Sequence, residues 1–188
     1  TGVQTCALPI YNTLLGVTGS GKTEIYIKLI EKFLEDKKQV LYLLPEIALT
    51  TQLVSRLTKH FGNKVAVFHS KYSNNERVEV WNNVLNSSEK AQIIIGARSA
   101  LFLPFNHLGL IIVDEEHEAT FKQYDPSPRY HARDAGIVLA SYHKSKVLLG
   151  SATPSIETYY NASTGKYSLV SLHERYGNSV LPEIQLVD

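Results

Sequence analysis

The sequence predicts an α/β fold in which a mostly parallel sheet carries helices on both faces. Short, uninterrupted apolar runs recur along the chain, as expected for strands that are covered on both sides. Between these runs lie segments in which apolar residues repeat every four positions, which indicates amphipathic helices. Alternation of such strands and helices is typical of a parallel sheet with helical crossovers.

The elements can be assigned in chain order. Apolar runs predict strands at Leu14–Leu15 and at residues 40–44, 65–68, 93–95, 110–113 and 147–149. Helical periodicity predicts helices over residues 25–36, 49–61, 74–86 and 132–142. Gly62 is expected to end the second helix, because glycine readily adopts the left-handed conformation that follows a helix.

Composition limits the functions that need to be considered. The chain has 188 residues, of which 44% are hydrophobic and 20% charged, as in a globular domain. It has no apolar run long enough for a membrane span. The 19 Lys and Arg residues are nearly balanced by 18 Asp and Glu residues, so the net charge is only +1. Nucleic-acid contacts would therefore require a local basic patch. A single cysteine, Cys6, excludes an internal disulfide and a cysteine-rich zinc site, and fits a reducing cytoplasmic compartment.

Both ends of the chain differ from the middle. Residues 1–10 have no initial methionine and no signal-peptide pattern, and they look like the translation of a sequencing-adapter oligonucleotide. We interpret them as an artefact, with a genuine N-terminal strand or linker as the alternative. The domain is then expected to span residues 11–176. Residues 177–188 resemble the start of a linker towards a second lobe.

A phosphate-binding loop is predicted between the first strand and the first helix. The pattern G-x-x-x-x-G-K-[ST] is formed by Gly16, Val17, Thr18, Gly19, Ser20, Gly21, Lys22 and Thr23. Glycines allow backbone N–H groups to approach phosphate oxygens, and the helix N-terminus adds positive charge. Lys22 is expected to bind the β- and γ-phosphates of ATP, and Thr23 to bind Mg²⁺. The alternative is a glycine-rich turn without a ligand.

An acidic segment follows the apolar run that ends at Val113. It consists of Asp114, Glu115, Glu116 and His117, at the carboxyl end of a strand, where open α/β sheets bind ligands. Asp114 is expected to hold Mg²⁺ through water, and Glu115 to polarise the attacking water as a general base. Alone, such a segment also fits a solvated loop, but the upstream phosphate-binding loop favours the chemical interpretation.

A third strand ends in Ser151, Ala152 and Thr153, which alone would also fit a turn before a helix that starts at Pro154 or Ser155. In this order, the three segments resemble motifs I, II and III of superfamily 2 helicases. The resemblance implies a RecA-like P-loop NTPase lobe. It also implies that Glu116 and His117, together with residues 151–153, couple the nucleotide site to a DNA site.

Further segments resemble the PriA family of bacterial replication-restart helicases. They are residues 45–50, 96–102, 114–118, 121–124 and 128–134. The resemblance implies a 3′-to-5′ DNA helicase that uses ATP and Mg²⁺, binds single-stranded and forked DNA, and meets primosome and single-strand-binding proteins. It also implies that Thr50 and Arg98 touch the DNA backbone, and that an aromatic-rich loop stacks on a base. The loop residues are Phe121, Tyr124, Arg129 and Tyr130, and packing of their rings on the protein is the alternative.

The same resemblance limits the activity expected of this lobe alone. Members of the family complete the ATP site with arginines from a second lobe, and they carry cysteine-rich zinc sites and a fork-binding region elsewhere. We therefore expect weak Mg·ATP binding, little hydrolysis and no unwinding. The alternatives are a RecG-like or RecQ-like translocase, an RNA helicase, or an isolated nucleotide- and DNA-binding lobe. A P-loop transporter ATPase is disfavoured, because no Leu-Ser-Gly-Gly signature occurs.

Overall fold

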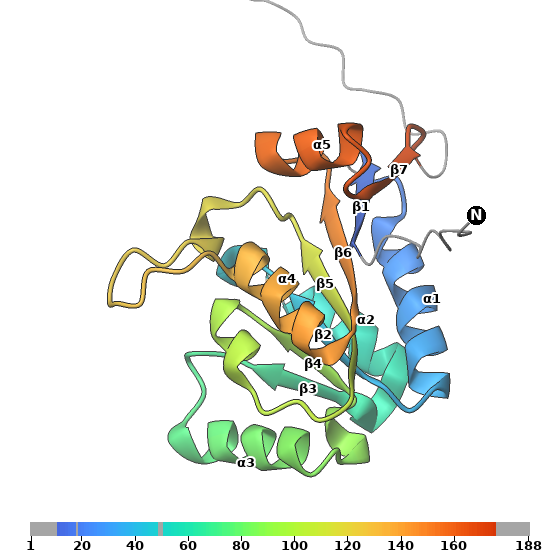
Figure 1. Cartoon of the computed structure of the whole chain (residues 1–188). Helices are drawn as coiled ribbons and strands as arrows, with labels where there is room; N and C mark the ends of the chain where they lie inside the picture. Colours follow the sequence, from blue (N-terminus) through green and yellow to red (C-terminus); the bar gives the residue numbers. More distant parts are fainter. Residues whose placement is uncertain (1–10, 18, 49–50, 176–188) are drawn as a thin grey trace, which may run out of the picture.

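A seven-stranded sheet in which every strand pairing is parallel forms the centre of the molecule (Figure 1). The computed structural model describes residues 11–17, 19–48 and 51–175. The strand order is β3-β4-β2-β5-β6-β1-β7. The strands are β1 (Tyr11–Gly16), β2 (Gln39–Leu43), β3 (Val65–Phe68), β4 (Ile93–Gly96), β5 (Leu108–Asp114), β6 (Lys146–Ser151) and β7 (Ser168–Leu172). The predicted fold class is confirmed.

Helices cover both faces of this sheet. They are α1 (Lys22–Glu35), α2 (Thr51–Phe61), α3 (Asn74–Leu85), α4 (Ala132–His143) and α5 (Ile156–Ser163). Side chains of β2 alternate between the two layers, so that Val40 and Tyr42 pack with α1 and α2, whereas Leu41 and Leu43 pack on the side of α3, α4 and α5. All residues of β2 and β4 are buried, which explains the continuous apolar runs at residues 40–43 and 93–95.

The strand order brings the three predicted motifs to one edge of the sheet. β1 and β5 lie on either side of β6, with Leu15 opposite Ser151 and Asp114 opposite Gly150. Because all strands are parallel, their carboxyl ends share one edge. The phosphate-binding loop after β1, the acidic segment after β5 and the Ser-Ala-Thr segment after β6 are therefore neighbours.

One α-helix and one strand were not assigned from the sequence. Helix α5 begins after Ser155, whose side chain accepts a hydrogen bond from the Thr158 N–H, so a helix does start close to the Ser-Ala-Thr segment. Strand β7 adds an edge to the sheet beside β1. Its sequence has only the apolar pair Leu169 and Val170 between two serines, which is too short a run to predict a strand. These two residues are 43% and 50% exposed, as expected for an edge strand.

The assignments of residues 1–10 as an artefact and 177–188 as a linker lie outside the described residues, and they stay predictions. In the described part of the chain, no helix combines the length and the apolar character needed to cross a bilayer.

We expect Gly150→Ala to destabilise the fold. A Cβ at this position of β6 would lie 1.8 Å from the hydroxyl oxygen of Tyr26, so the helix or the strand must shift. Overpacking of this kind costs about 1–3 kcal/mol of the free energy of unfolding, which urea denaturation measures. Gly136→Ala in α4 is the control, because its Cβ would meet no atom closer than 3.6 Å. If both variants unfold at the same urea concentration, the steric assignment is wrong.

Candidate nucleotide site and nucleic-acid surface

The loop between β1 and α1 is a tight backbone cradle. Gly19 and Gly21 have φ angles of 80° and 86°, in the left-handed region that glycine tolerates. A Cβ on Gly16 would lie 2.6 Å from the Ser20 Oγ, so a larger residue would fill the cradle. Thr18 of the predicted motif lies outside the described residues.

The polar groups of this loop match a phosphate ligand. The Nζ of Lys22 donates a hydrogen bond of 2.8 Å to the Gly16 carbonyl, which holds the ammonium group over the loop. The buried Ser20 Oγ has no hydrogen-bond partner in the described part of the chain. Thr23 follows in the first turn of α1, whose N-terminal end carries positive partial charge. The cradle, the unpaired hydroxyl and the ammonium group fit the phosphates of a nucleotide with its metal ion.

Two tyrosines hold the first acidic residue. Asp114 Oδ1 accepts a hydrogen bond of 2.9 Å from the Tyr26 hydroxyl, and Oδ2 accepts one of 3.0 Å from Tyr42. The two rings pack edge to face, with centroids 5.6 Å apart. Neither tyrosine was predicted from the sequence as part of the site, although each places a hydroxyl in an apolar segment, Tyr26 in the stripe of α1 and Tyr42 in β2.

Burial is the main cause of the pKa shifts of the acidic residues and tyrosines at this edge of the sheet. It raises the pKa of Asp114, while hydrogen bonds from Tyr26 and Tyr42 and the nearby Lys22 oppose this effect. Burial also raises the pKa of Glu115, and the charge of Asp114 adds to the rise. Burial and Asp114 raise the pKa values of both tyrosines, so the phenols remain protonated donors. Glu115 thus combines an elevated proton affinity with a half-exposed position beside Lys22, as a group that accepts a proton from water requires.

The predicted coupling residues are partly brought together. The Nδ1 of His117 lies 2.8 Å from the Ser151 Oγ, and its Nε2 lies 3.4 Å from the Thr153 Oγ1. The same Nδ1 is 3.7 Å from a carboxylate oxygen of Glu115. His117 therefore joins the acidic segment to the end of β6, and Ala152 lies between its two hydroxyl partners in the chain.

Glu116 has a different environment from its neighbours. Its side chain is fully buried, and its Oε2 pairs with the Nη1 of Arg133 at 2.9 Å. The Ser155 N–H donates to Oε1 at 2.7 Å, and the Thr158 hydroxyl donates to Oε2 at 3.0 Å. Glu116 therefore links the end of β5 to the first turns of α4 and α5.

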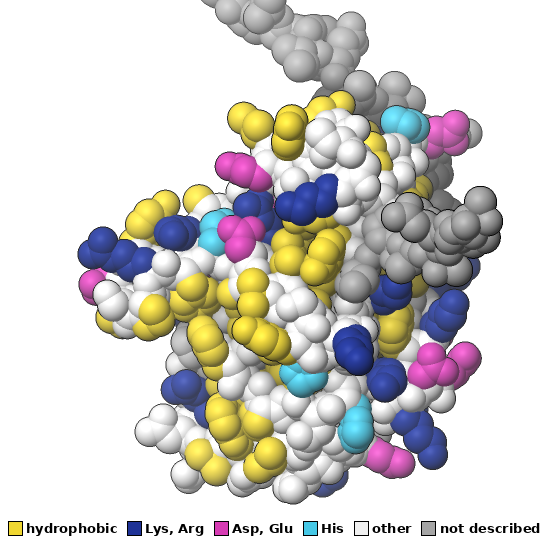
Figure 2. Space-filling model, in the orientation of Figure 1, with side chains coloured by type: hydrophobic (Ala, Val, Ile, Leu, Met, Phe, Trp, Pro, Cys, Tyr) yellow, Lys and Arg dark blue, Asp and Glu magenta, His cyan; other side chains and the backbone are white. Residues whose placement is uncertain are grey.

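Arg98 forms hydrogen bonds to the start of the loop that was predicted to stack on DNA, which spans residues 122–131. Its Nη1 donates to the carbonyl oxygens of Thr120 and Lys122, at 3.1 and 3.0 Å. The loop is closed by a bridge between Lys122 and His131, and it projects from the body of the molecule (Figure 1). Figure 2 shows Lys or Arg side chains and hydrophobic side chains together on this projection.

The aromatic residues of this loop differ in exposure. Tyr124 is 68% exposed, and Arg129 is also exposed. Tyr130 packs edge to face on Phe102, with centroids 5.2 Å apart. Phe121 is only 1% exposed and belongs to the core, so the prediction that its ring stacks on a base is wrong for this conformation. Thr50, the other predicted DNA contact, lies outside the described residues.

We expect Arg133→Met to be strongly destabilising. The substitution leaves the Glu116 carboxylate buried without its cation, which costs about 3–5 kcal/mol of the free energy of unfolding. Glu116→Gln combined with Arg133→Met removes the unpaired charge and is expected to recover much of that loss, as measured by urea denaturation. Asp134→Asn is the control, because Asp134 pairs with the same arginine but its side chain is 60% exposed. Equal losses for Arg133→Met and Asp134→Asn would contradict the importance of the buried pair.

The Lys22→Met variant is expected to have a steeper dependence of stability on pH. The pKa values of Asp114 and Glu115 in the folded chain lie above their ordinary values of 3.8 and 4.5, so the folded chain binds these protons more tightly. Stability from this source is present at low pH and is lost as pH rises through the folded pKa values. Lys22 lowers both pKa values, and its removal raises them further.

The measurement is the urea midpoint between about pH 4 and pH 8. Lys28→Met removes an exposed lysine from the same helix and is expected to follow the unmodified chain. The double variant Lys22→Met and Asp114→Asn lacks one of the two titrating carboxyl groups. It is expected to lose much of the additional dependence of stability on pH that Lys22→Met alone shows. Parallel profiles for Lys22→Met and the unmodified chain would show that Lys22 does not act on these carboxyl groups.

Comparison with known proteins agrees with this geometry. The family model for DEAD/DEAH box helicases matches residues 3–162. Replication restart protein PriA of Bacillus subtilis is 49% identical over 175 residues, which cover 93% of this chain and 21% of that protein. PriA of Haemophilus influenzae is 51% identical over 164 residues, which cover 87% of this chain and 22% of that protein. The chain thus spans about a fifth of the length of these relatives.

Solved structures show the same fold. RecG bound to a three-way DNA junction has a TM-score of 0.63 at 21% identity, over 89% of this chain and 21% of that one. The helicase MrfA bound to DNA has a TM-score of 0.62 at 18% identity, over 86% of this chain and 25% of that one. The sheet, the motif order and the matched sequence agree, and the chain belongs to the DEAD/DEAH box helicase family.

Proposed function

We propose that this chain is the ATP-binding first lobe of an ATP-dependent 3′-to-5′ DNA helicase of replication restart. The observation that carries the proposal is the convergence of Lys22, Asp114 and His117 at one sheet edge, in a sequence about half identical to replication restart proteins. The substrates are single-stranded and forked DNA, and the partners are primosome and single-strand-binding proteins. Zinc belongs to parts of the whole protein outside this chain.

Each residue of the proposed ATP site has its own role in binding or chemistry. Backbone N–H groups of the loop and the Lys22 ammonium would bind phosphate oxygens, while Thr23 and Asp114 would hold a Mg²⁺ ion. When bound, this ion supplies positive charge that stabilises the charge developing on the phosphates. Tyr26 and Tyr42 keep the Asp114 carboxylate in one orientation. Glu115 accepts a proton from the attacking water at its carboxylate.

His117 is the proposed link between this chemistry and DNA. Its hydrogen-bond distances to Ser151 and Thr153, together with its approach to Glu115, connect the ATP side to the end of β6. Arg98 supports the loop that carries Tyr124 and Arg129, whose exposed side chains suit sequence-independent contacts with a single strand. Without arginines from a second lobe, we propose that turnover by this lobe is very low.

The test is a titration with a fluorescent ATP analogue in the presence of Mg²⁺. Lys22→Ala removes a charge-assisted hydrogen bond to phosphate and is expected to weaken binding by about 10- to 100-fold. Lys28→Ala is the matched control, because it removes an exposed lysine between one and two turns further along α1. Unchanged binding by Lys22→Ala would contradict the phosphate assignment, and rapid DNA-stimulated hydrolysis by this chain alone would contradict the low turnover.

A further inference from the structure

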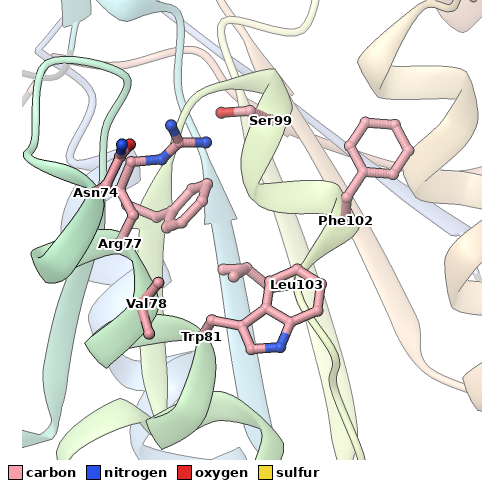
Figure 3. Close-up of a pocket in the computed structure, with 8 residues that line it drawn as sticks. Asn74, Arg77, Val78, Trp81, Ser99, Phe102 and Leu103 are labelled. Carbon is pink, nitrogen blue, oxygen red and sulfur yellow. The ribbon is translucent and has the colours of Figure 1, made fainter.

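A groove between α3 and the 3₁₀ turn Arg98–Phe102 is not used by the proposed ATP site. The hollow has a volume of about 430 Å³. It is lined by Phe68, Asn74, Arg77, Val78, Trp81, Ser99, Phe102 and Leu103. Figure 3 shows Asn74, Arg77, Val78 and Trp81 on the side of α3, and Ser99 and Phe102 on the side of the turn. We refer to it as the α3 groove.

The α3 groove has aromatic walls and a buried apolar floor. Trp81 is 43% exposed and Phe102 is 58% exposed, whereas Phe68 and Leu103 beneath them are buried. Large apolar side chains that gather around a hollow mark an interaction site more often than single exposed ones do. Indole and phenyl rings offer flat faces on which a planar ring system can stack.

Arg77 is the one charged residue among those that line the α3 groove. Its guanidinium lies over the Phe68 ring, 5.4 Å from the centroid, and it has no ion pair within the described residues. Asn74 and Ser99 add groups that can donate and accept hydrogen bonds. Because the lining contains a cation and no carboxylate, it is complementary to an anion that carries a planar ring.

The α3 groove is continuous with the surface that we propose for DNA. Ser99 directly follows Arg98, which holds the projecting loop in place. Phe102 contacts Tyr130 of that loop edge to face, at 5.2 Å and 83°. Phe68 ends β3, so the groove opens at the same carboxyl edge of the sheet as Arg98, which follows β4. A DNA strand that crosses the projecting loop can therefore reach the α3 groove along the same edge of the sheet.

We propose that the α3 groove binds one unstacked base of single-stranded DNA. Trp81 and Phe102 contact the base, and Arg77 binds the adjacent phosphate. The inference rests on the proposed function, because it extends the DNA surface of the same lobe. Sequence-independent binding follows, since every base has a face that can stack and the phosphate is common to all.

Trp81 supplies a direct test, because it is the one tryptophan of the chain. The probes are an oligothymidylate of about 12 nucleotides and an abasic oligonucleotide of equal length, each with a fluorescent end label. Anisotropy of the label reports binding, and Trp81 emission reports the groove. We expect oligothymidylate to quench Trp81 emission and the abasic strand to leave it unchanged. Binding of oligothymidylate with no change in Trp81 emission would overturn the inference while leaving the DNA surface intact.

Two variants separate stacking from phosphate binding. Phe102→Ala is expected to weaken oligothymidylate binding at least about fivefold and to leave binding of the abasic strand unchanged. Arg77→Gln is expected to weaken both probes and to reduce the salt dependence of binding by about 0.7 in the logarithmic slope. Tyr142→Ala, which removes an aromatic side chain that is 81% exposed on α4, is the matched control.

Retained binding of the fluorescent ATP analogue shows that each variant is folded. Equal loss of both probes by Phe102→Ala, or equal loss by Phe102→Ala and Tyr142→Ala, would overturn stacking in the groove. If neither probe binds the unmodified chain, the proposed DNA function fails together with this inference. Normal ATP-analogue binding in that case would leave the nucleotide site standing.

Discussion

The buried Glu116 carboxylate is the interaction on which the arrangement of the sheet edge depends. A fully buried charge is tolerated only when it is paired and fully hydrogen-bonded, and Glu116 meets this condition through Arg133, Ser155 and Thr158. These partners belong to the starts of α4 and α5. Because the buried Glu116 carboxylate needs all of these partners to offset its desolvation, the starts of α4 and α5 are held next to the end of β5.

This anchoring leaves the neighbouring acidic residues free for chemistry. Asp114 is held from the opposite face of the sheet, by Tyr26 of α1 and Tyr42 of β2. Glu115 has a φ angle of 50°, which is uncommon for a residue with a side chain and turns the backbone between its two neighbours. Successive residues thus point to different partners, and Glu115 keeps a half-exposed carboxylate that interacts with the charge of Lys22.

Much of this arrangement could be predicted from the sequence. The six strands other than β7 contain apolar runs, which are buried throughout in β2 and β4, and the phosphate-binding loop has a pattern whose Gly19 and Gly21 are required by the backbone. The support for Asp114 was missed because Tyr26 and Tyr42 fit the apolar pattern of their elements, and only the sheet order brings their hydroxyl groups to β5. Phe121 was misplaced because an aromatic-rich segment does not reveal which of its rings turns inward.

The sheet order also separates the two functions that the lobe is proposed to combine. β1, β6 and β5 lead to the proposed nucleotide residues, whereas β4 and β3 lead to Arg98 and the α3 groove. β5 lies at the boundary, and the segment after it contains His117 on one side and the projecting loop on the other. His117 and the projecting loop therefore belong to one short segment, and Glu116 ties the start of that segment to α4 and α5.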